Sequence, residues 1–153
     1  MSDAKVVRPM RAQLTSIGAL ERLTSQAVDE WLDTQLGPGI LMINAACGCA
    51  DRVARPGVAL AMRHGNRPKR FATVFAGLDH AATARVRARF AHIPPSSPSV
   101  ALFMDGVAVD FLPRERIEGR TAQQVGDELM AMFDAHFGVA EPPQPARGVQ
   151  LPP

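Results

Sequence analysis

The sequence has no apolar segment of about 20 residues, the length that a membrane-spanning helix needs. Its most continuous apolar run, Gly39 to Cys47, is short and contains Asn44. The polar residues 1–5 lead to no apolar segment of the kind that secretory signals have. No stripe of basic and aromatic residues, zinc-finger spacing or recognition-helix pattern indicates nucleic-acid binding. We therefore expect a cytoplasmic protein whose partners include neither membranes nor nucleic acids.

Cysteine is scarce as well. The chain has 153 residues, a net charge of +2 and only two cysteines, Cys47 and Cys49. This length suits one domain, and 46% hydrophobic residues are enough for a packed core. Structural disulfides are rare in a reducing compartment. Two cysteines separated by Gly48 alone therefore indicate a chemical role.

The hydrophobic pattern predicts helices that alternate with short strands. Thr121 and Gln124 form a capping-box pattern that opens the last helix, and Asp79 is a candidate N-cap. Pro56 lies inside the third predicted helix and is expected to kink it. The predicted elements are helices 8–18 and 25–36, a strand 40–45, a helix 50–63, a strand 71–76, a helix 79–90, strands 99–104 and 107–112, and a helix from 121 to about 137.

The order of these elements predicts a mixed sheet. A strand–helix–strand unit with a right-handed crossover gives two parallel strands, and Asp105-Gly106 is a strong hairpin signal for an antiparallel pair. The arrangement resembles the thioredoxin-like α/β fold, with a four-stranded mixed sheet of order 2-1-3-4 flanked by helices. The additional first strand of thioredoxin is expected to be missing. We expect a thioredoxin-like domain with N-terminal helices over residues 1–138 and a disordered proline-rich tail over 139–153.

The position of the cysteines indicates thiol–disulfide exchange. Cys47 follows a strand and precedes a helix, where free backbone N–H groups favour an anion and lower a thiol pKa from about 8.5. Cys49 lies in the first helical turn and could attack a mixed disulfide formed on Cys47. Gly48 provides backbone freedom between them. The sequence therefore predicts Cys47 as the nucleophile and Cys49 as the resolving thiol.

Two other interpretations of the cysteine pair are weaker. Buried cysteines are often inert core residues, but a pair at a strand-to-helix junction favours redox chemistry. A closed metal site would need two further ligands, and the four histidines more often lie at the surface or cap helices. We therefore expect neither a resident metal nor a bound cofactor.

Two other segments are candidates for binding the substrate. Residues 98–106 resemble the segment of thioredoxin-like proteins in which a cis proline faces the reactive cysteine, so we expect Pro98 in cis. The backbone of Ser97 and Ser99 beside it would then pair with an incoming chain or thiol adduct. Arg52 and Arg55 share a helix face; they could stabilise the thiolate or hold a carboxylate, although a solvated face is the better interpretation for Arg52.

Several motifs in order resemble one family. The segment 44–50, Asn-Ala-Ala-Cys-Gly-Cys-Ala, and its continuation Ala54-Arg55-Pro56 resemble the signature of the bacilliredoxins. The resemblance runs from about Val7 to His136. Further matching segments are 9–11, 14–15, 74–77, 95–99, 113–114, 117–119 and 133–136.

The resemblance implies an oxidoreductase that removes bacillithiol, or a similar small thiol, from protein mixed disulfides. Cys47 would attack the bacillithiol sulfur, Cys49 would resolve the adduct, and Arg55 would contact the malate group of bacillithiol. Asn44 and Gly48 would support the site. The implied co-substrate is a low-molecular-weight thiol and the implied partners are S-thiolated client proteins. A disulfide isomerase, a general thioredoxin-like reductase and a non-catalytic metal-binding module of the same fold are the alternatives.

Overall fold

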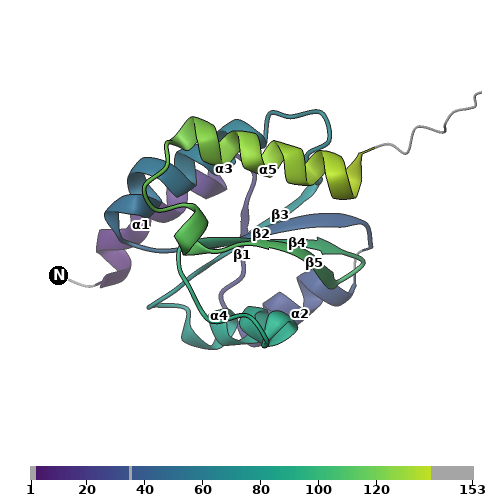
Figure 1. Cartoon of the computed structure of the whole chain (residues 1–153). Helices are drawn as coiled ribbons and strands as arrows, with labels where there is room; N and C mark the ends of the chain where they lie inside the picture. Colours follow the sequence, from purple (N-terminus) through teal and green to yellow (C-terminus); the bar gives the residue numbers. More distant parts are fainter. Residues whose placement is uncertain (1–2, 35, 139–153) are drawn as a thin grey trace, which may run out of the picture.

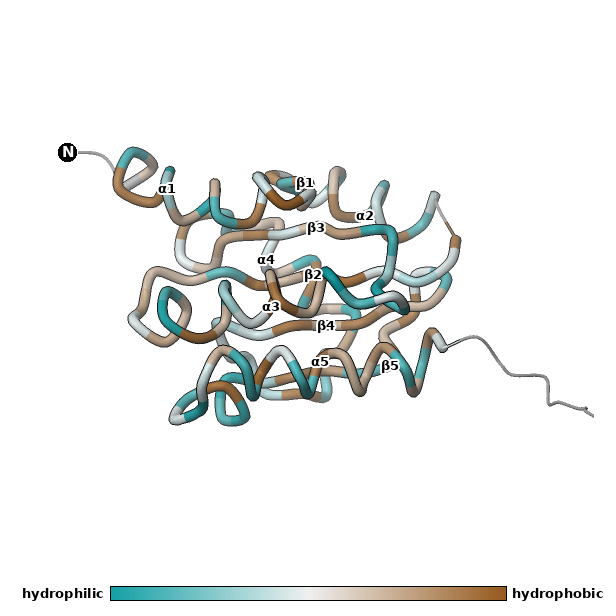
Figure 2. The backbone as a smooth tube through the Cα atoms, turned by 90° about the horizontal axis from the view of Figure 1, so that it is seen from above, coloured by the Kyte–Doolittle hydropathy of each residue, from teal (hydrophilic) through white to brown (hydrophobic). Residues whose placement is uncertain are grey.

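A five-stranded sheet forms the centre of the molecule in the computed structural model, which describes residues 3–34 and 36–138 (Figure 1). The strand order is β1-β3-β2-β4-β5, and Figure 2 shows the strands side by side in this order. β1, β3 and β2 are mutually parallel, whereas β4 is antiparallel to both β2 and β5. The strands are β1 Leu20–Glu21, β2 Pro38–Asn44, β3 Arg70–Phe75, β4 Ser99–Met104 and β5 Val107–Leu112.

Helices cover both faces of the sheet. α1, α3 and α5 lie on one face, and α2 and α4 lie on the other (Figure 1). The helices are α1 Asp3–Thr15, α2 Ser25–Asp33, α3 Arg55–Ala61, α4 His80–Arg87 and α5 Ala122–Phe137. Short segments join them: a π-helical segment η1 Ala50–Ala54 and the 3-10 turns η2 Ala88–Phe90 and η3 Arg114–Arg116.

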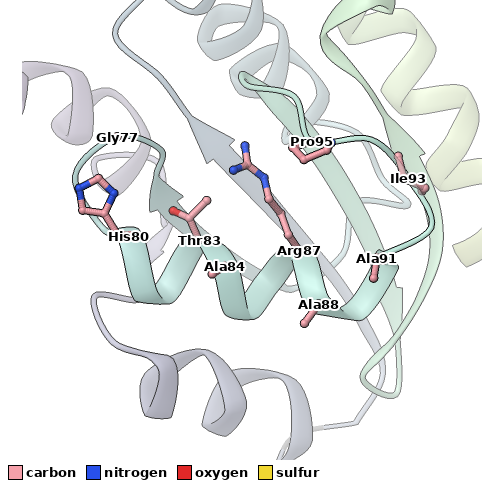
Figure 3. Close-up of a pocket in the computed structure, with 9 residues that line it drawn as sticks. All are labelled: Gly77, His80, Thr83, Ala84, Arg87, Ala88, Ala91, Ile93 and Pro95. Atoms are coloured by element: carbon pink, nitrogen blue, oxygen red, sulfur yellow. The ribbon is translucent and has the colours of Figure 1, made fainter.

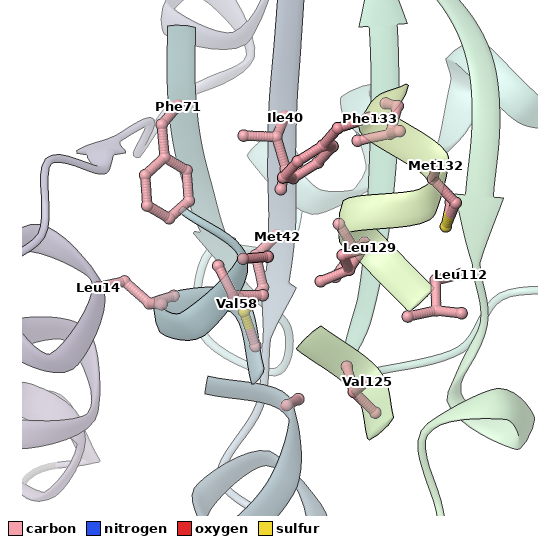
Figure 4. Packing of buried hydrophobic residues seen from close by; sticks show 14 of the residues in the cluster. Leu14, Ile40, Met42, Val58, Phe71, Leu112, Val125, Leu129, Met132 and Phe133 are labelled. Carbon is pink, nitrogen blue, oxygen red and sulfur yellow. The ribbon is translucent and has the colours of Figure 1, made fainter. Parts of the chain in front are cut away.

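β2 divides the core into two layers because successive side chains of a strand point to opposite faces. Ile40 and Met42 pack under α3 and α5 (Figure 4), whereas Leu41 and Ile43 pack against α2 and α4. All four side chains are fully buried, and burying each contributes about 1.5–3 kcal/mol. A central strand covered on both faces explains the nearly continuous apolar run that the sequence shows.

The sheet has five strands, so the prediction of four strands was wrong. The order predicted for those four is confirmed as β3-β2-β4-β5. The additional first strand, expected to be missing, is present as β1, where Leu20 pairs with Ala72 and Glu21 with Thr73. Two residues, of which Leu20 is exposed, give no alternating pattern that could have identified a strand.

The helix predicted over residues 50–63 is divided into two segments. The N–H of Arg55 donates to the carbonyl of Ala50, which is the wider spacing of a π-helix. A continuing α-helix would bring the ring of Pro56 against the carbonyl of Arg52. The helical turn before Pro56 is instead the wider π-helical turn of η1, and Pro56 lies in the first turn of α3.

Most remaining helix predictions differ only at the ends. The first helix is Asp3–Thr15 rather than 8–18, and the second ends at Asp33. The capping box of Thr121 and the hairpin turn with positive φ at Asp105 are confirmed. The Asp79 side chain does not cap α4, because it accepts hydrogen bonds from Arg11 and from the N–H of Phe75. The tail 139–153 lies outside the described residues, so its disorder stays a prediction.

Two glycines allow α3 and α5 to pack closely under the site. A Cβ atom at Gly57 would lie 2.8 Å from Cγ1 of Val125, and one at Gly126 would lie 3.1 Å from Cβ of Leu60. Both distances are shorter than ordinary contacts between carbon atoms. The close approach of the two helices therefore depends on the absence of these side chains.

We predict that Gly57→Ala lowers the free energy of unfolding by about 1–3 kcal/mol through overpacking, although alanine favours a helix by up to about 1 kcal/mol. Gly65→Ala is the matched control, because no heavy atom lies within 4 Å of a Cβ placed there. Urea unfolding followed by circular dichroism measures both variants. A Gly57→Ala protein as stable as wild type would contradict this account of the α3–α5 contact.

Candidate functional site

The cysteine pair lies where the chain leaves the central strand and enters the helical layer. β2 ends at Asn44, and Cys47 lies three residues before the first residue of η1, Ala50. The carbonyl of Cys47 accepts hydrogen bonds from the N–H groups of Ala50 and Asp51 at 3.1 and 3.2 Å. Both cysteines are free thiols, half-buried, with their Sγ atoms 3.2 Å apart. The structure therefore brings the sulfur atoms of the two cysteines predicted to be reactive into direct contact.

The pKa values of the two thiols are shifted in opposite directions. Burial raises the pKa of Cys47, but the hydrogen bond from Cys49, the N–H of Ala50 and the charge of Arg114 outweigh it, so this pKa lies below that of an ordinary thiol. Burial also raises the pKa of Cys49, and the hydrogen bond and charge of Cys47 raise it further. Cys47 is thus the more acidic of the two thiols, which favours it as the nucleophile, while the roles of the two cysteines stay a prediction.

An open cleft of about 460 Å³ borders both cysteines. Three arginines line it, Arg52, Arg114 and Arg120, with Glu118 as the only acidic side chain in its lining. Arg120 is paired with Glu128 of α5. The cleft beside Cys47 is therefore positively charged.

Gly48 allows Arg52 to approach the cysteine turn. A Cβ atom at Gly48 would lie 2.7 Å from Nη2 of Arg52. Arg52 is exposed, and its side chain makes no hydrogen bond or ion pair with the described residues. Its position on the rim of the cleft is consistent with the predicted solvated face, while its charge remains close to Cys47 and Cys49.

Arg114 is the site residue that the sequence interpretation missed. Its guanidinium donates to Glu118 at 3.0 Å and to the carbonyl of Ser97 at 3.2 Å. It also lines the cleft with the two cysteines. The only sequence signal was the match of residues 113–114 to the family, which suggested no role. Arg114 therefore joins the cysteine cleft to the loop that precedes β4.

The predicted cis proline is present in that loop. The Ser97–Pro98 peptide bond is cis, and Pro98 is buried. Ile43 of β2 pairs with Ser99 of β4, so this loop lies beside the end of the strand that leads to Cys47. The Ser99 hydroxyl is fully buried and donates to the carbonyl of Ser96. Pairing of Ser97 and Ser99 with a substrate stays a prediction.

Arg55 does not face the cleft, contrary to the expectation that it meets a substrate carboxylate. Its side chain is 2% exposed, and it does not line the cavity beside Cys47. Its guanidinium instead donates within 2.7–3.1 Å to four oxygen atoms, those of Gln13, Asn44, Asp51 and the carbonyl of Ala45. With its donors used inside the protein, Arg55 supports the turn before Cys47.

Asn44 completes this support. Its Oδ1 accepts hydrogen bonds from Arg55 and from the N–H of Ala45, both at 2.9 Å. Its Nδ2 donates to the carbonyl of Met10 in α1 at 3.3 Å. The supporting role predicted for Asn44 therefore has a structural basis, since this buried amide connects α1 to the end of β2.

Metal binding and membrane insertion are two further functions that can be assessed from the side chains of residues 3–34 and 36–138. Over these ranges, no group of three or more His, Cys, Asp and Glu side chains is arranged to hold a metal ion. His64 pairs with Asp134, and His136 pairs with Asp110, on the surface. None of the helices in this part of the chain combines the length and the apolar character that crossing a membrane requires.

Comparisons with known proteins agree with this geometry. A family model described as disulphide isomerase matches residues 3–137. The chain is 44% identical over 144 residues to a bacilliredoxin of Salinibacter ruber, covering 93% of this chain and 85% of the relative. It is 46% identical over 129 residues to a bacilliredoxin of Symbiobacterium thermophilum, covering 84% and 91%.

Solved structures establish the fold. Thioredoxin f2 of Chlamydomonas reinhardtii has a TM-score of 0.55 at 17% identity and covers 80% of this chain and 99% of its own. Fasciola hepatica thioredoxin has a TM-score of 0.53 at 17% identity and covers 74% and 98%. The thioredoxin-like fold predicted from the sequence is therefore confirmed.

We predict that Cys47 is alkylated by iodoacetamide at a lower pH than Cys49, and that Arg114→Met raises the pKa of Cys47. Loss of a positive charge destabilises the thiolate, so the rate profile moves to higher pH. Peptide mapping by mass spectrometry follows each cysteine separately.

Arg116→Met is the matched control, since Arg116 lies in the same turn η3 but pairs with Glu128 and does not line the cleft. Alkylation of Cys49 first, or equal profiles for Arg114→Met and wild type, would contradict the assignment of the thiolate to Cys47 beside Arg114.

Proposed function

Because this chain belongs to the bacilliredoxin family, we propose that it removes a small thiol, bacillithiol in the first instance, from protein mixed disulfides. The family and the thioredoxin-like fold support a thiol–disulfide redox function. One observation mainly supports the removal of a small thiol as the specific reaction. The two thiols are in contact, their pKa values are shifted in opposite directions, and they lie beside an arginine-lined cleft. We propose the cytoplasm as the compartment, where small-thiol pools maintain such reactions.

The reaction that these residues support has two exchange steps. The thiolate of Cys47 attacks the small-thiol sulfur of the mixed disulfide, and a new disulfide forms between Cys47 and the small thiol. The old bond breaks, and its electron pair leaves with the client sulfur, which takes up a proton. Cys49 then loses its proton and attacks the Cys47 sulfur, which releases the reduced small thiol. The cysteine pair is oxidised to a disulfide while the client thiol and the small thiol are both reduced.

Proton location favours this order of attack. Cys47 is the more acidic thiol, so it reacts first, and Cys49 remains protonated until the adduct has formed. Once Cys47 is bound in a disulfide, its negative charge no longer raises the pKa of Cys49. The sulfur atoms are 3.2 Å apart, which leaves Cys49 within reach of the adduct. Release of the adduct by a second external thiol is the competing route.

Recognition of the small thiol is assigned to the arginines of the cleft. Bacillithiol carries a malate group, and arginine binds carboxylates through paired hydrogen bonds. Arg114 lies closest to this role, because its charge acts on both sulfur atoms and its side chain is 39% exposed. We assign to Arg114 the carboxylate contact that the sequence predicted for Arg55, because the buried guanidinium of Arg55 is already hydrogen-bonded within the protein.

A disulfide isomerase is the second candidate, since the matching family model has that description. An isomerase would use Cys47 to attack a disulfide within a client, and it would not need the positive cleft. Activity that restores a scrambled client containing no small thiol, and that survives Arg114→Met, would favour this alternative.

We predict that one client protein is released faster from its bacillithiol adduct than from an adduct with neutral 2-mercaptoethanol. The carboxylates of bacillithiol meet the positive charge of the cleft, whereas the neutral thiol does not. Arg114→Met should reduce this preference several-fold, while Arg116→Met should retain it. Single-turnover mass spectrometry of the client measures each rate, with a glutathione adduct as the third substrate.

Equal rates for all three adducts would reject bacillithiol specificity and leave a general thiol–disulfide reductase. If wild type releases no small thiol under conditions in which thioredoxin reduces a control disulfide, the proposed reaction itself is wrong.

A further inference from the structure

A second cavity lies on the opposite face of the sheet from α3 and α5. It has a volume of about 410 Å³ and is bounded by α4 and the segment leading to Pro95 (Figure 3). Its polar side chains are His80, Thr83 and Arg87, which lie along one stripe of α4, and none of its lining residues is acidic. We call this cavity the Arg87 pocket. None of its lining residues takes part in the two exchange steps described above.

Two polar groups of the Arg87 pocket are buried without a partner. Thr83 is 4% exposed, and its hydroxyl has no hydrogen-bond partner among the described residues. The Nε of Arg87 is also buried and unpaired within this part of the chain. Burying a hydrogen-bonding group without a partner is costly. Two residues that line the pocket therefore each carry a donor that none of the described residues satisfies.

Arg87 has no acidic partner within ion-pair distance among the described residues. The one hydrogen bond of its side chain to the described residues is from Nη2 to the carbonyl of Ser96 at 3.2 Å. On the same helix, by contrast, Arg85 lies 3.7 Å from Asp29. A cation and a hydroxyl in a cavity without carboxylates favour an anionic ligand, and a carboxylate can accept from both donors at once.

The Arg87 pocket and the cysteine cleft adjoin the same loop. Arg87 donates to the carbonyl of Ser96, and Arg114 of the cleft donates to the carbonyl of Ser97. Gly77, which lines the pocket, follows the end of β3, and β3 runs parallel to the strand that leads to Cys47. The two cavities therefore lie at the same end of the sheet, one beyond each side of residues 96–98.

We propose that the Arg87 pocket binds a carboxylate of the client polypeptide, supplied by an acidic residue near the thiolated cysteine. This inference rests on the proposed function. A mixed disulfide joins the small thiol to the client chain, and these two groups extend in different directions from the disulfide bond that Cys47 attacks. The small thiol occupies the Arg114 cleft, so the client chain extends past residues 96–98 toward Arg87. The pocket would thus select clients that carry an acidic residue near the reactive cysteine.

The first test measures binding without any redox step. Wild-type protein labelled with ¹⁵N is titrated with N-acetyl-glutamate amide and with the corresponding glutamine compound. Saturable shifts of the amides of residues 80–93 and 96 are expected for the glutamate probe alone. Thr83→Val and Arg87→Met should lose these shifts, whereas Thr83→Ser, which keeps the hydroxyl, and Arg85→Met, which removes a charge outside the pocket, should retain them. Absence of saturable shifts in wild type, or equal shifts with both probes, would overturn the proposal.

The second test measures selection of the client. Peptides with one thiolated cysteine carry glutamate or glutamine at successive positions on either side of it, each as a bacillithiol and as a 2-mercaptoethanol adduct. At one position or more, the glutamate peptide should react several-fold faster with either small thiol, and Arg87→Met should bring this ratio close to one while Arg85→Met retains it. A ratio near one in wild type, or a preference that depends on the small thiol alone, would overturn the proposal. If no peptide is reduced, the proposed function fails, and the titration still decides whether the pocket binds a carboxylate.

Discussion

The geometry of the cysteine site depends on the buried guanidinium of Arg55. This group connects Gln13 of α1, the end of β2 at Asn44 and Ala45, and Asp51 of η1. A buried charge is tolerated only when it is paired and hydrogen-bonded, and here the surrounding oxygens provide those bonds. Removing the guanidinium would leave the carbonyl of Ala45 without this donor, two residues before the nucleophile. The buried guanidinium of Arg55 therefore stabilises the turn before Cys47 and is not accessible to a substrate.

Positive charge has two separate roles around this turn. The buried Arg55 fixes the backbone, whereas the half-exposed Arg114 lowers the pKa of Cys47 and faces the cleft. Arg114 also binds Ser97 next to the cis peptide bond, so the thiolate and the loop before β4 share one cation.

The sequence predicted those features that depend on continuous or local patterns. The apolar run of β2, the Asp105 turn and the Thr121 capping box each lie within a few residues, and Cys47 and Pro98 belong to segments that resemble known ones. β1 could not be predicted, because two residues show no alternation. The role of Arg55 was misjudged since helical spacing placed it on a face with Arg52, whereas the π-helical turns of η1 change the direction in which the following side chains point. Arg114 is far from the cysteines in sequence, and only the fold brings it to them.

The central claim is that Cys47 takes the small thiol and leaves the client free. It is tested most directly by reacting the Cys49→Ser protein with a bacillithiolated client and mapping the trapped species by mass spectrometry. The account predicts a stoichiometric bacillithiol adduct on Cys47 together with a client that carries a free thiol. A disulfide between Cys47 and the client polypeptide, or an unmodified Cys47 beside a client that still carries its bacillithiol adduct, would contradict it.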